Sequence, residues 1–495
     1  MASNLIQIRK KGEKKDNASK EEKPLVGIKS KSKSKPKKVL LIFPPQNLKE
    51  RYAHNVGNVG GFLPPLGLCY MAAVLEKRGH DVRIMDCPVN DFRINHIMDE
   101  VRTFQPDVIG TAAITSLVEV TAGICKRIKT EFPNTTILVG GPHATIMPEK
   151  AAKEMGADIV LVEEADGMIS EIVENLEKYK KMKIVHCGKV KDLNTLPYPA
   201  RHLLDMSKYT SLPNAYKTTP NVIQMVTSRG CPYTCTFCFD AMGTFRQRSV
   251  DNVIGEIKLL RKEYGMKEVA FWDDILTLNK KWVHEFCDKL IKEKLDTTWS
   301  CYTRLNLVDL PLLKHMKEAG CWNIFYGIEA GDQELLDNMK KHMKLEDMKK
   351  GVRWTQEAGI EIRGSFMVGL PGETPEKAKK TIAFAIELEP DYAQFSITTP
   401  YPGTQLWDDF EKWGTLDKTF KNYHGWSPVF VPYGYKNREE LMKIHKEAFR
   451  KFYLRPKYIA KRLWKMTGSW NDIKRGIDGL KVVMGMLKKE KTTGH

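Results

Sequence analysis

Short apolar runs alternate with stretches of helical periodicity along residues 38–189. Each run is continuous and ends at polar or turn-forming residues, which is typical of strands buried on both faces. The alternation predicts an α/β domain with a doubly wound parallel sheet, which binds ligands beyond the carboxyl ends of its strands. Strands are expected at 39–43, 81–85, 108–111, 136–139 and 159–162, with helices at 66–78, 94–104, 118–132, after 148 and at 168–179.

A second alternating series occupies residues 221–400. Its six β/α units predict a partial (β/α)6 barrel whose chemistry lies at the carboxyl end of the strands. Residues 190–220 show neither strand nor helix periodicity and are expected to form a linker. Residues 401–495 are first rich in aromatic residues and then show a helical, basic pattern. Strands are expected at 222–227, 269–272, 298–302, 324–328, 362–368 and 394–398.

The chain of 495 residues carries a net charge of +18, which is concentrated at its two ends. Residues 1–40 hold 13 basic and 4 acidic side chains, and residues 451–495 hold 12 and 3, so the body between them is neutral. A neutral body argues against a basic groove for nucleic acid, while basic ends suit an anionic surface. Residues 1–37, rich in Lys and Ser, are expected to be a disordered leader. No stretch predicts a membrane span or a signal sequence, so we expect a cytoplasmic protein.

Three of the ten cysteines, Cys231, Cys235 and Cys238, stand in one C-x3-C-x2-C loop. Thiolates at this spacing can converge on one metal centre, and iron–sulfur clusters use such ligands. A [4Fe–4S] cluster normally takes four cysteines, so the lack of a fourth nearby would leave one iron open to a small molecule. A zinc site or incidental buried thiols are the alternatives. The other seven are expected to be buried apolar residues, with a second cluster from distant thiols left open: Cys69, Cys87, Cys125, Cys187, Cys287, Cys301 and Cys321.

The cysteine loop, with Phe237 before its last cysteine and a barrel strand ahead of it, resembles the radical S-adenosylmethionine (SAM) superfamily. The resemblance covers residues 222–400. It implies that the open iron chelates the amino and carboxylate groups of SAM, and that the reduced cluster cleaves SAM to a 5′-deoxyadenosyl radical. The chain is then expected to be an enzyme that needs a low-potential electron donor.

Residues at the ends of the later strands match segments with which this family contacts SAM. Asp273 and Asp274 follow the second strand, although both also fit as helix N-caps. Glu329 is expected to face the barrel cavity, and the glycines of segment 366–374 let the backbone approach a ligand closely. The resemblance implies SAM contacts from Asp273, Asp274, Arg304, Glu329, Gly369, Pro371 and Gly372.

A doubly wound domain ahead of such a barrel is similar to the cobalamin (B12)-binding branch of the superfamily. That branch includes methylases of unactivated carbons and the anaerobic magnesium-protoporphyrin cyclase, and some relatives keep the domain without binding cobalamin. Two features depart from it: the D-x-H-x-x-G signature is absent, and a Gly-Glu-Gly-Glu run is replaced at residues 163–167. The resemblance implies a corrin near Pro65, Gly67, Ser116, Gly140, Gly141 and His143, where His143 also fits as a capping or core histidine.

Residues 437–466 predict a helix, and a further amphipathic segment follows it. Apolar residues at helical spacing among cations predict an interfacial helix on an anionic membrane, and a solvated helix docked on the barrel is the alternative. The apolar positions are Ile473, Ile477, Leu480, Met484 and Leu487, and the cations among them are Lys474, Arg475, Lys481, Lys488 and Lys489.

These features together predict cobalamin-dependent methylation of an unactivated carbon on a lipid or other hydrophobic substrate, at the inner face of the membrane. The main alternative is cobalamin-free radical C–C bond formation or oxidative cyclisation on a lipid or polycyclic substrate. Radical SAM modification of tRNA is a lesser alternative, because the pattern lacks the second cysteine triad and terminal RNA-binding barrel of those enzymes. A corrinoid or electron carrier without catalytic activity is the last alternative.

Overall fold

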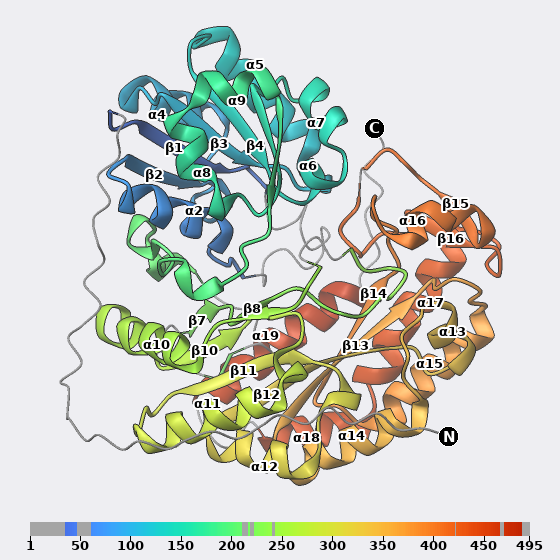
Figure 1. The fold of residues 1–495 in the computed structure, drawn as a ribbon. Coiled ribbons are helices and arrows are strands. Elements are labelled where there is room, and N and C mark those ends of the chain that lie inside the picture. Colours follow the sequence, from blue (N-terminus) through green and yellow to red (C-terminus); the bar gives the residue numbers. More distant parts are fainter. Residues whose placement is uncertain are drawn as a thin grey trace, which may run out of the picture.

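The computed structural model describes residues 35–46, 61–209, 216–217, 222–239, 243–420, 422–465 and 470–487. Most of the predicted basic leader lies outside these ranges, as do Lys488 and Lys489. The described chain forms two six-stranded parallel sheets, one in the N-terminal part and one in the middle part of the molecule (Figure 1). This arrangement confirms the predicted α/β class with two successive parallel-sheet units.

The N-terminal sheet has the order β2-β1-β3-β4-β5-β6. Its strands are buried on both faces: in β1, Leu40 and Ile42 belong to one apolar cluster, and Val39 and Leu41 belong to another. The edge strand β6 was not predicted, because only Val185 of its five residues is fully buried. The strands are β1 Lys38–Phe43, β2 Asp81–Asp86, β3 Val108–Ala112, β4 Thr136–Gly140, β5 Ile159–Glu163 and β6 Ile184–Gly188, and the helices are α2 Leu66–Lys77, α3 Cys87–Asn90, α4 Ile94–Phe104, α5 Val118–Glu131, α6 Pro142–Ile146, α7 Pro148–Glu154, α8 Ile169–Glu174 and α9 Leu176–Met182.

The second sheet has the order β14-β13-β12-β11-β10-β7, so its main strands follow the chain in one open arc. Helices cover its outer face, where Phe271, Trp299 and Phe366 are fully buried (Figure 1). On the inner face Tyr302 and Phe325 are only half-buried. The strands are β7 Val222–Met225, β10 Glu268–Phe271, β11 Thr298–Thr303, β12 Cys321–Glu329, β13 Glu361–Val368 and β14 Tyr392–Ile397, and the helices are α10 Val250–Tyr264, α11 Lys280–Lys292, α12 Leu310–Glu318, α13 Gln333–Asn338, α14 Leu345–Glu357 and α15 Pro375–Leu388.

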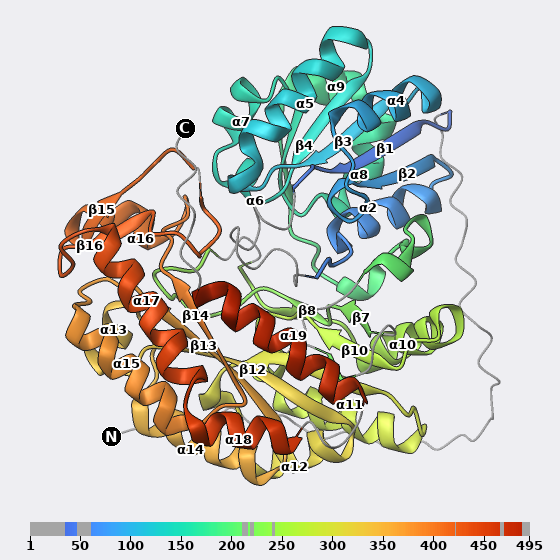
Figure 2. The same cartoon turned by 180° about the vertical axis from the view of Figure 1, so that it is seen from behind.

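Three helices end the described chain: α17 (Arg438–Tyr453), α18 (Pro456–Lys465) and α19 (Trp470–Leu487). The single helix predicted at 437–466 is therefore wrong, because Pro456 disfavours helical geometry at the residue before it. Helix α17 packs against α15 and β14. Helix α19 crosses the second sheet on the side opposite to α10–α12 (Figure 2). Among the described helices, none is long and apolar enough to cross a membrane.

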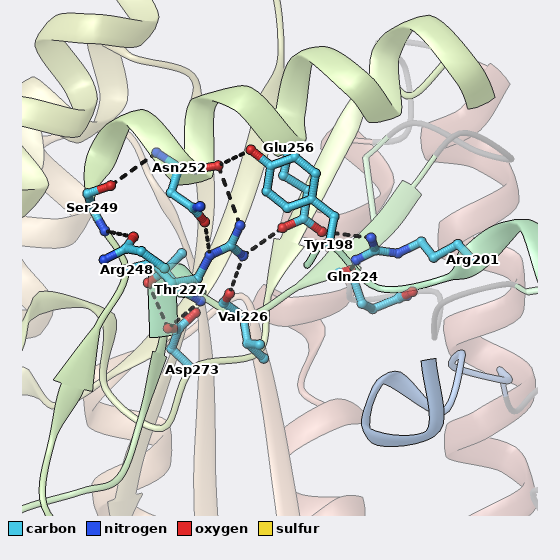
Figure 3. Close-up of polar contacts among 11 residues, drawn as sticks. Tyr198, Arg201, Gln224, Val226, Thr227, Arg248, Ser249, Asn252, Glu256 and Asp273 are labelled. Atoms are coloured by element: carbon cyan, nitrogen blue, oxygen red, sulfur yellow. Dashed lines mark hydrogen bonds and ion pairs between the residues drawn. The ribbon is translucent and has the colours of Figure 1, made fainter. Parts of the chain in front are cut away.

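A buried ionic network ties the segment between the two sheets to the second sheet (Figure 3). Arg201, 2% exposed, donates to Glu256 Oε1 at 2.7 Å and to the carbonyl of Gln224 at 2.8 Å. Arg248 pairs with Glu256 Oε2 at 2.6 Å. Burial by itself would raise the pKa of Glu256, but Arg248 and Arg201 hold it below its ordinary value. Arg201 of the predicted linker thus belongs to the packed interior.

Candidate functional site

The cysteine loop is closed at its base by a short antiparallel ladder. Strand β8 (Ser228–Arg229) pairs with β9 (Arg246–Gln247), and the loop between them carries the three cysteines. Gly230 has φ +92°, and a Cβ there would lie 2.6 Å from the carbonyl oxygen of Gly243. Only glycine tolerates both the left-handed conformation and this contact, so Gly230 fixes how the chain enters the loop.

The three thiols line one hollow of about 480 Å³ at the carboxyl end of β7. Cys235 is buried and Cys238 is exposed, so the loop lies at the boundary between protein and solvent. Within the described residues no trio of His, Cys, Asp and Glu is placed closely enough to hold a metal ion. The soft donor set and the space suit a [4Fe–4S] cluster, but these thiols share the hollow without meeting at one point.

Two cations lie beside the thiols. Arg304 Nη1 is 3.7 Å from Cys235 Sγ, and its guanidinium stacks on Tyr233 with 3.7 Å to the ring centroid. Lys341 forms a buried ion pair with Glu329 at 2.8 Å and lies 5.9 Å from the ring of Phe237. Burial raises the pKa of Cys238 to about 12, and the charge of Lys341 opposes that rise. Arg304 and Glu329, two of the residues implied for SAM contact, therefore lie beside the cysteine loop, whereas Lys341, in the loop after α13, carried no signal in the sequence.

Asp273 anchors the cysteine segment rather than capping a helix (Figure 3). Its Oδ1 accepts hydrogen bonds from the Thr227 N–H at 2.9 Å, the Thr227 hydroxyl at 2.7 Å and the Ser228 hydroxyl at 2.6 Å. Burial raises the pKa of Asp273 to about 6 against these bonds, and its Oδ2 has no partner. Asp274 is exposed, and helix α11 is capped by Asn279 instead. The N-cap interpretation of this acidic pair was therefore wrong.

The glycine segment after β13 forms a tight turn held by a carboxyl group. Gly369 and Gly372 have φ +77° and +76°, and a Cβ on Gly369 would lie 3.1 Å from Leu441. Glu373, fully buried, accepts the Gly369 N–H at 2.6 Å and the Tyr435 hydroxyl at 2.5 Å. Burial raises the pKa of Glu373 to about 7. The carbonyl of Pro371 accepts from Asn338 at 3.2 Å. Sequence reasoning missed Glu373, because its partner Tyr435 is remote in the chain.

The six residues implied for cobalamin lie at loops and helix starts around the N-terminal sheet. Gly140 ends β4, and the next residue, Gly141, has φ +101°. A Cβ on Gly141 would lie 3.0 Å from the carbonyl oxygen of Ala113. Only glycine permits this backbone approach. Ser116 lies in the turn η1 (Thr115–Leu117) after β3, and Pro65 and Gly67 lie at the start of α2, where Gly67 is exposed.

His143 is fully buried in α6. Its Nδ1 lies 3.4 Å from the Thr115 hydroxyl, whereas its Nε2 has no partner. The edge of its ring faces Phe420, with 5.6 Å between centroids. Burial, assisted by Lys150, lowers the pKa of His143 to about 4, so the imidazole is neutral. A neutral ring with one unbonded nitrogen suits an amide-rich ligand such as a corrin, but Phe420 already covers this histidine.

The loop after β5 links the two sheets. Arg229, two residues before Cys231, pairs with Asp166 at 2.7 Å and with Glu164 at 3.1 Å. Arg246, on the opposite side of the cysteine loop, pairs with Glu164 at 2.5 Å. The acidic residues that replace the expected glycine-rich run thus clamp the base of the cysteine loop, and the carboxyl edges of both sheets face each other.

Known proteins share both halves of this arrangement. The description "B12 binding domain" matches residues 53–173, and "Radical SAM superfamily" matches residues 225–385. An uncharacterized methyltransferase of Pyrococcus horikoshii is 33% identical over 473 residues, which cover 90% of this chain and 98% of that protein. The chain belongs to the B12-binding-domain branch of the radical SAM superfamily. It is accordingly a radical SAM enzyme, with a [4Fe–4S] cluster, SAM and cobalamin as its cofactors.

Two further proteins place this radical SAM enzyme among diverse relatives. The anaerobic magnesium-protoporphyrin IX monomethyl ester cyclase of Rubrivivax gelatinosus is 28% identical over 452 residues, covering 85% of this chain and 78% of the cyclase. The methyltransferase TsrM of Kitasatospora setae, solved with cobalamin and a [4Fe–4S] cluster, matches with a TM-score of 0.62 at 14% identity, over 91% of this chain and 99% of TsrM. The second match concerns the fold alone.

Proposed function

We propose that this enzyme methylates an unactivated carbon of a small hydrophobic molecule. The observation that carries the proposal is the ionic clamp, in which Asp166 and Glu164 of one sheet edge hold Arg229 beside the cysteine loop of the other. When bound, the cluster and SAM supply a 5′-deoxyadenosyl radical, and cobalamin supplies the methyl group. The chain's own residues hold the two cofactor sites at a fixed separation, which is the condition for two consecutive reactions on one carbon.

The second sheet edge supplies the proposed iron and SAM ligands. Cys231, Cys235 and Cys238 are the proposed iron ligands, and Arg304 keeps positive charge next to Cys235. Lys341 and Arg304 are suited to the carboxylate of SAM, because Arg304 contacts Cys235 and Lys341 lies beside Phe237 of the cysteine loop. Proposed SAM contacts also come from Asp273, Asp274, Glu329, Gly369, Pro371 and Gly372, and proposed corrin contacts come from Pro65, Gly67, Ser116, Gly140, Gly141 and His143.

Metal analysis and product analysis test this function together. Protein purified without oxygen, with a low-potential reductant, is expected to contain iron, sulfide and cobalt and to convert SAM to S-adenosylhomocysteine as well as 5′-deoxyadenosine. Cys235→Ala is expected to lose both products. Cobalt near zero after reconstitution, or the absence of S-adenosylhomocysteine, would contradict methylation.

Oxidative cyclisation or C–C bond formation is the second candidate function. The magnesium-protoporphyrin cyclase, which is 28% identical over 85% of this chain, favours it. Such a reaction would yield 5′-deoxyadenosine without S-adenosylhomocysteine, so the same product analysis separates the two candidates.

We further propose that the C-terminal helices contact an anionic membrane on the inner side of the cell, from which a lipid substrate would be collected. Leu463, Trp464 and Leu480 of α18 and α19 are 60%, 76% and 59% exposed. Flotation with vesicles of phosphatidylglycerol is expected to carry the protein, and vesicles of phosphatidylcholine are expected to carry less. Leu463→Ser with Trp464→Ser should abolish flotation, whereas Met182→Ser, exposed on α9, should not. Equal flotation with both lipids would contradict this proposal.

A further inference from the structure

The inner face of the second sheet carries one row of large side chains that core packing does not explain. Parallel pairing aligns Tyr302 of β11 with Phe325 of β12, and Phe325 with Arg363 of β13. Trp272, just after β10, extends the row, with 5.3 Å between its ring and that of Tyr302, which lies 4.9 Å from Phe325. Trp272 is 41% exposed, although it lies on the face that α19 crosses (Figure 2). The row therefore presents aromatic surface to solvent at its Trp272 end.

Arg363 lies in this row as a cation without a counter-charge. It is 5% exposed, and its guanidinium carbon lies 5.4 Å from the Tyr302 ring and 5.1 Å from the Phe325 ring. Its Nε donates to Asn323 Oδ1 at 2.6 Å. Within the described chain no carboxylate forms an ion pair with it. Burying a guanidinium without an anion is costly. Of the other buried arginines in the described chain, Arg201 and Arg248 share the carboxylate of Glu256, whereas Arg304 faces the thiol of Cys235.

The side-chain amide of Asn323, which lies beside Arg363, has a donor without an acceptor. Asn323 is completely buried, and its Nδ2 has no hydrogen-bond partner. Its Oδ1 already accepts from Arg363, so the two Nδ2 hydrogens of Asn323 lie next to the Arg363 guanidinium. Unsatisfied buried donors are rare in folded proteins, so the Asn323 amide beside an arginine without a carboxylate partner indicates a missing acceptor.

The row is separate from the residues suited to SAM. Phe325, the partner of Arg363, is four residues before Glu329 on β12, which corresponds to about 13 Å along a strand. Glu329 and Lys341 lie next to the cysteine loop, so Arg363 lies deeper in the barrel. Between the two levels the inner face carries Gly327 and Ser365, which are aligned on neighbouring strands. The Glu329–Lys341 ion pair packs against Gly327, where a Cβ would lie 2.5 Å from Glu329 Oε1, and so closes the row on the side of the cysteine loop.

We propose that this row binds the substrate and selects a flat, ring-containing molecule with an anionic group, such as a carboxylate. The anion pairs with Arg363 and accepts from Asn323, and the rings of Trp272, Tyr302 and Phe325 contact its apolar body. Arg363 is thus a specificity-determining residue. The identification of the ligand as the substrate rests on the proposed function, whereas the binding site itself does not.

Equilibrium dialysis of the anaerobic, reconstituted holoenzyme with SAM tests the site without turnover. The probes are 1-anilinonaphthalene-8-sulfonate, which is flat and anionic, and N-phenyl-1-naphthylamine, its neutral counterpart. Arg363→Met is expected to weaken sulfonate binding at least tenfold and to change binding of the neutral probe less than twofold. Trp272→Leu should weaken both probes. The matched control Arg353→Met, on the exposed face of α14, should change neither.

Circular dichroism and iron content show whether each variant is folded. Arg363→Lys keeps the charge and is expected to retain sulfonate binding within about threefold, which supplies a test if Arg363→Met does not fold. Unchanged sulfonate binding in Arg363→Met, or equal losses for both probes, would overturn the proposal. Charge-dependent binding without S-adenosylhomocysteine formation would retain the site and reject methylation, and the reverse result would retain methylation and reject the site.

Discussion

The carboxyl edges of the two sheets face each other but are built from different groups. The N-terminal edge depends on close backbone approach, as at Gly141 against Ala113, and its buried His143 is neutral. The second edge carries thiols, the cation Arg304 beside them, and the buried carboxyl of Glu373, whose pKa is raised. The first edge is thus neutral around His143, and its acidic residues Glu164 and Asp166 are paired with Arg229 and Arg246, whereas the second edge is suited to a charged metal cluster and a zwitterion. The difference indicates two cofactor sites with separate roles.

Removal of one thiol from each domain gives the largest expected contrast. Cys235→Ala should lose nearly all cluster iron, because the hollow would retain two of its three thiols. Cys187→Ala, in the half-buried edge strand β6, should keep its iron. Iron and sulfide analysis after anaerobic reconstitution measures both, and equal iron loss in the two variants would contradict the assignment.

The ionic network beneath the second edge predicts the largest change in stability. Glu256→Ala leaves Arg201 and Arg248 buried without their shared carboxylate, so the free energy of unfolding should fall by about 3–5 kcal/mol. Glu263→Ala, exposed on the same helix, should change it by less than about 0.5 kcal/mol. Urea denaturation measures both values, and similar midpoints would show that the network does not contribute as inferred.

The two edges should respond to pH with opposite signs. The pKa of His143 is lowered from 6.5 to about 4. Its contribution to the free energy of unfolding is therefore present above pH 6.5 and is lost as the pH falls towards 4. The pKa of Glu373 is raised from 4.5 to about 7, so its contribution is present below pH 4.5 and is lost as the pH rises through 7. Each group accounts for about 3 kcal/mol at most.

Unfolding free energies of the wild type, His143→Gln and Glu373→Gln between pH 4 and 8 measure this contrast. Relative to the wild type, His143→Gln should become less pH-dependent at the acidic end, and Glu373→Gln at the neutral end. The contrast between the edges would be rejected if both variants shifted the profile at the same end.

The clamp between the edges predicts the smallest effect. Arg229→Gln should cost about 1–3 kcal/mol, because Asp166 loses its pairing while Arg246 still holds Glu164. Arg93→Gln, which breaks an exposed pair with Asp91, should cost less than 1 kcal/mol. Thermal or urea denaturation measures the cost, and the electron paramagnetic resonance signal of the reduced cluster reports whether the loop is displaced. Equal costs for the two arginine variants would indicate that the clamp behaves as a surface pair.

Much of the fold was predictable because strands of a buried parallel sheet are continuous apolar runs in the sequence. The predicted strands of both sheets are present, and only β6 was missed, since most of its residues are not fully buried. The cysteine spacing likewise indicated an iron–sulfur cluster and, through its resemblance to the superfamily, radical SAM chemistry. The role of Asp273 was not predictable, because an acidic pair after a strand fits an N-cap equally well until Thr227 and Ser228 are brought next to it.

The sequence by itself determined the α/β class, the two successive sheets and the three-thiol loop, because periodicity and spacing are local properties of the chain. Tertiary structure alone decided which charges meet. Asp166 and Arg229 are 63 residues apart, and Asn323 and Arg363 are 40 apart. Such pairs arise only when strands are aligned and sheets are docked, so neither the clamp nor the unpaired cation of the inner face has a local signature in the sequence.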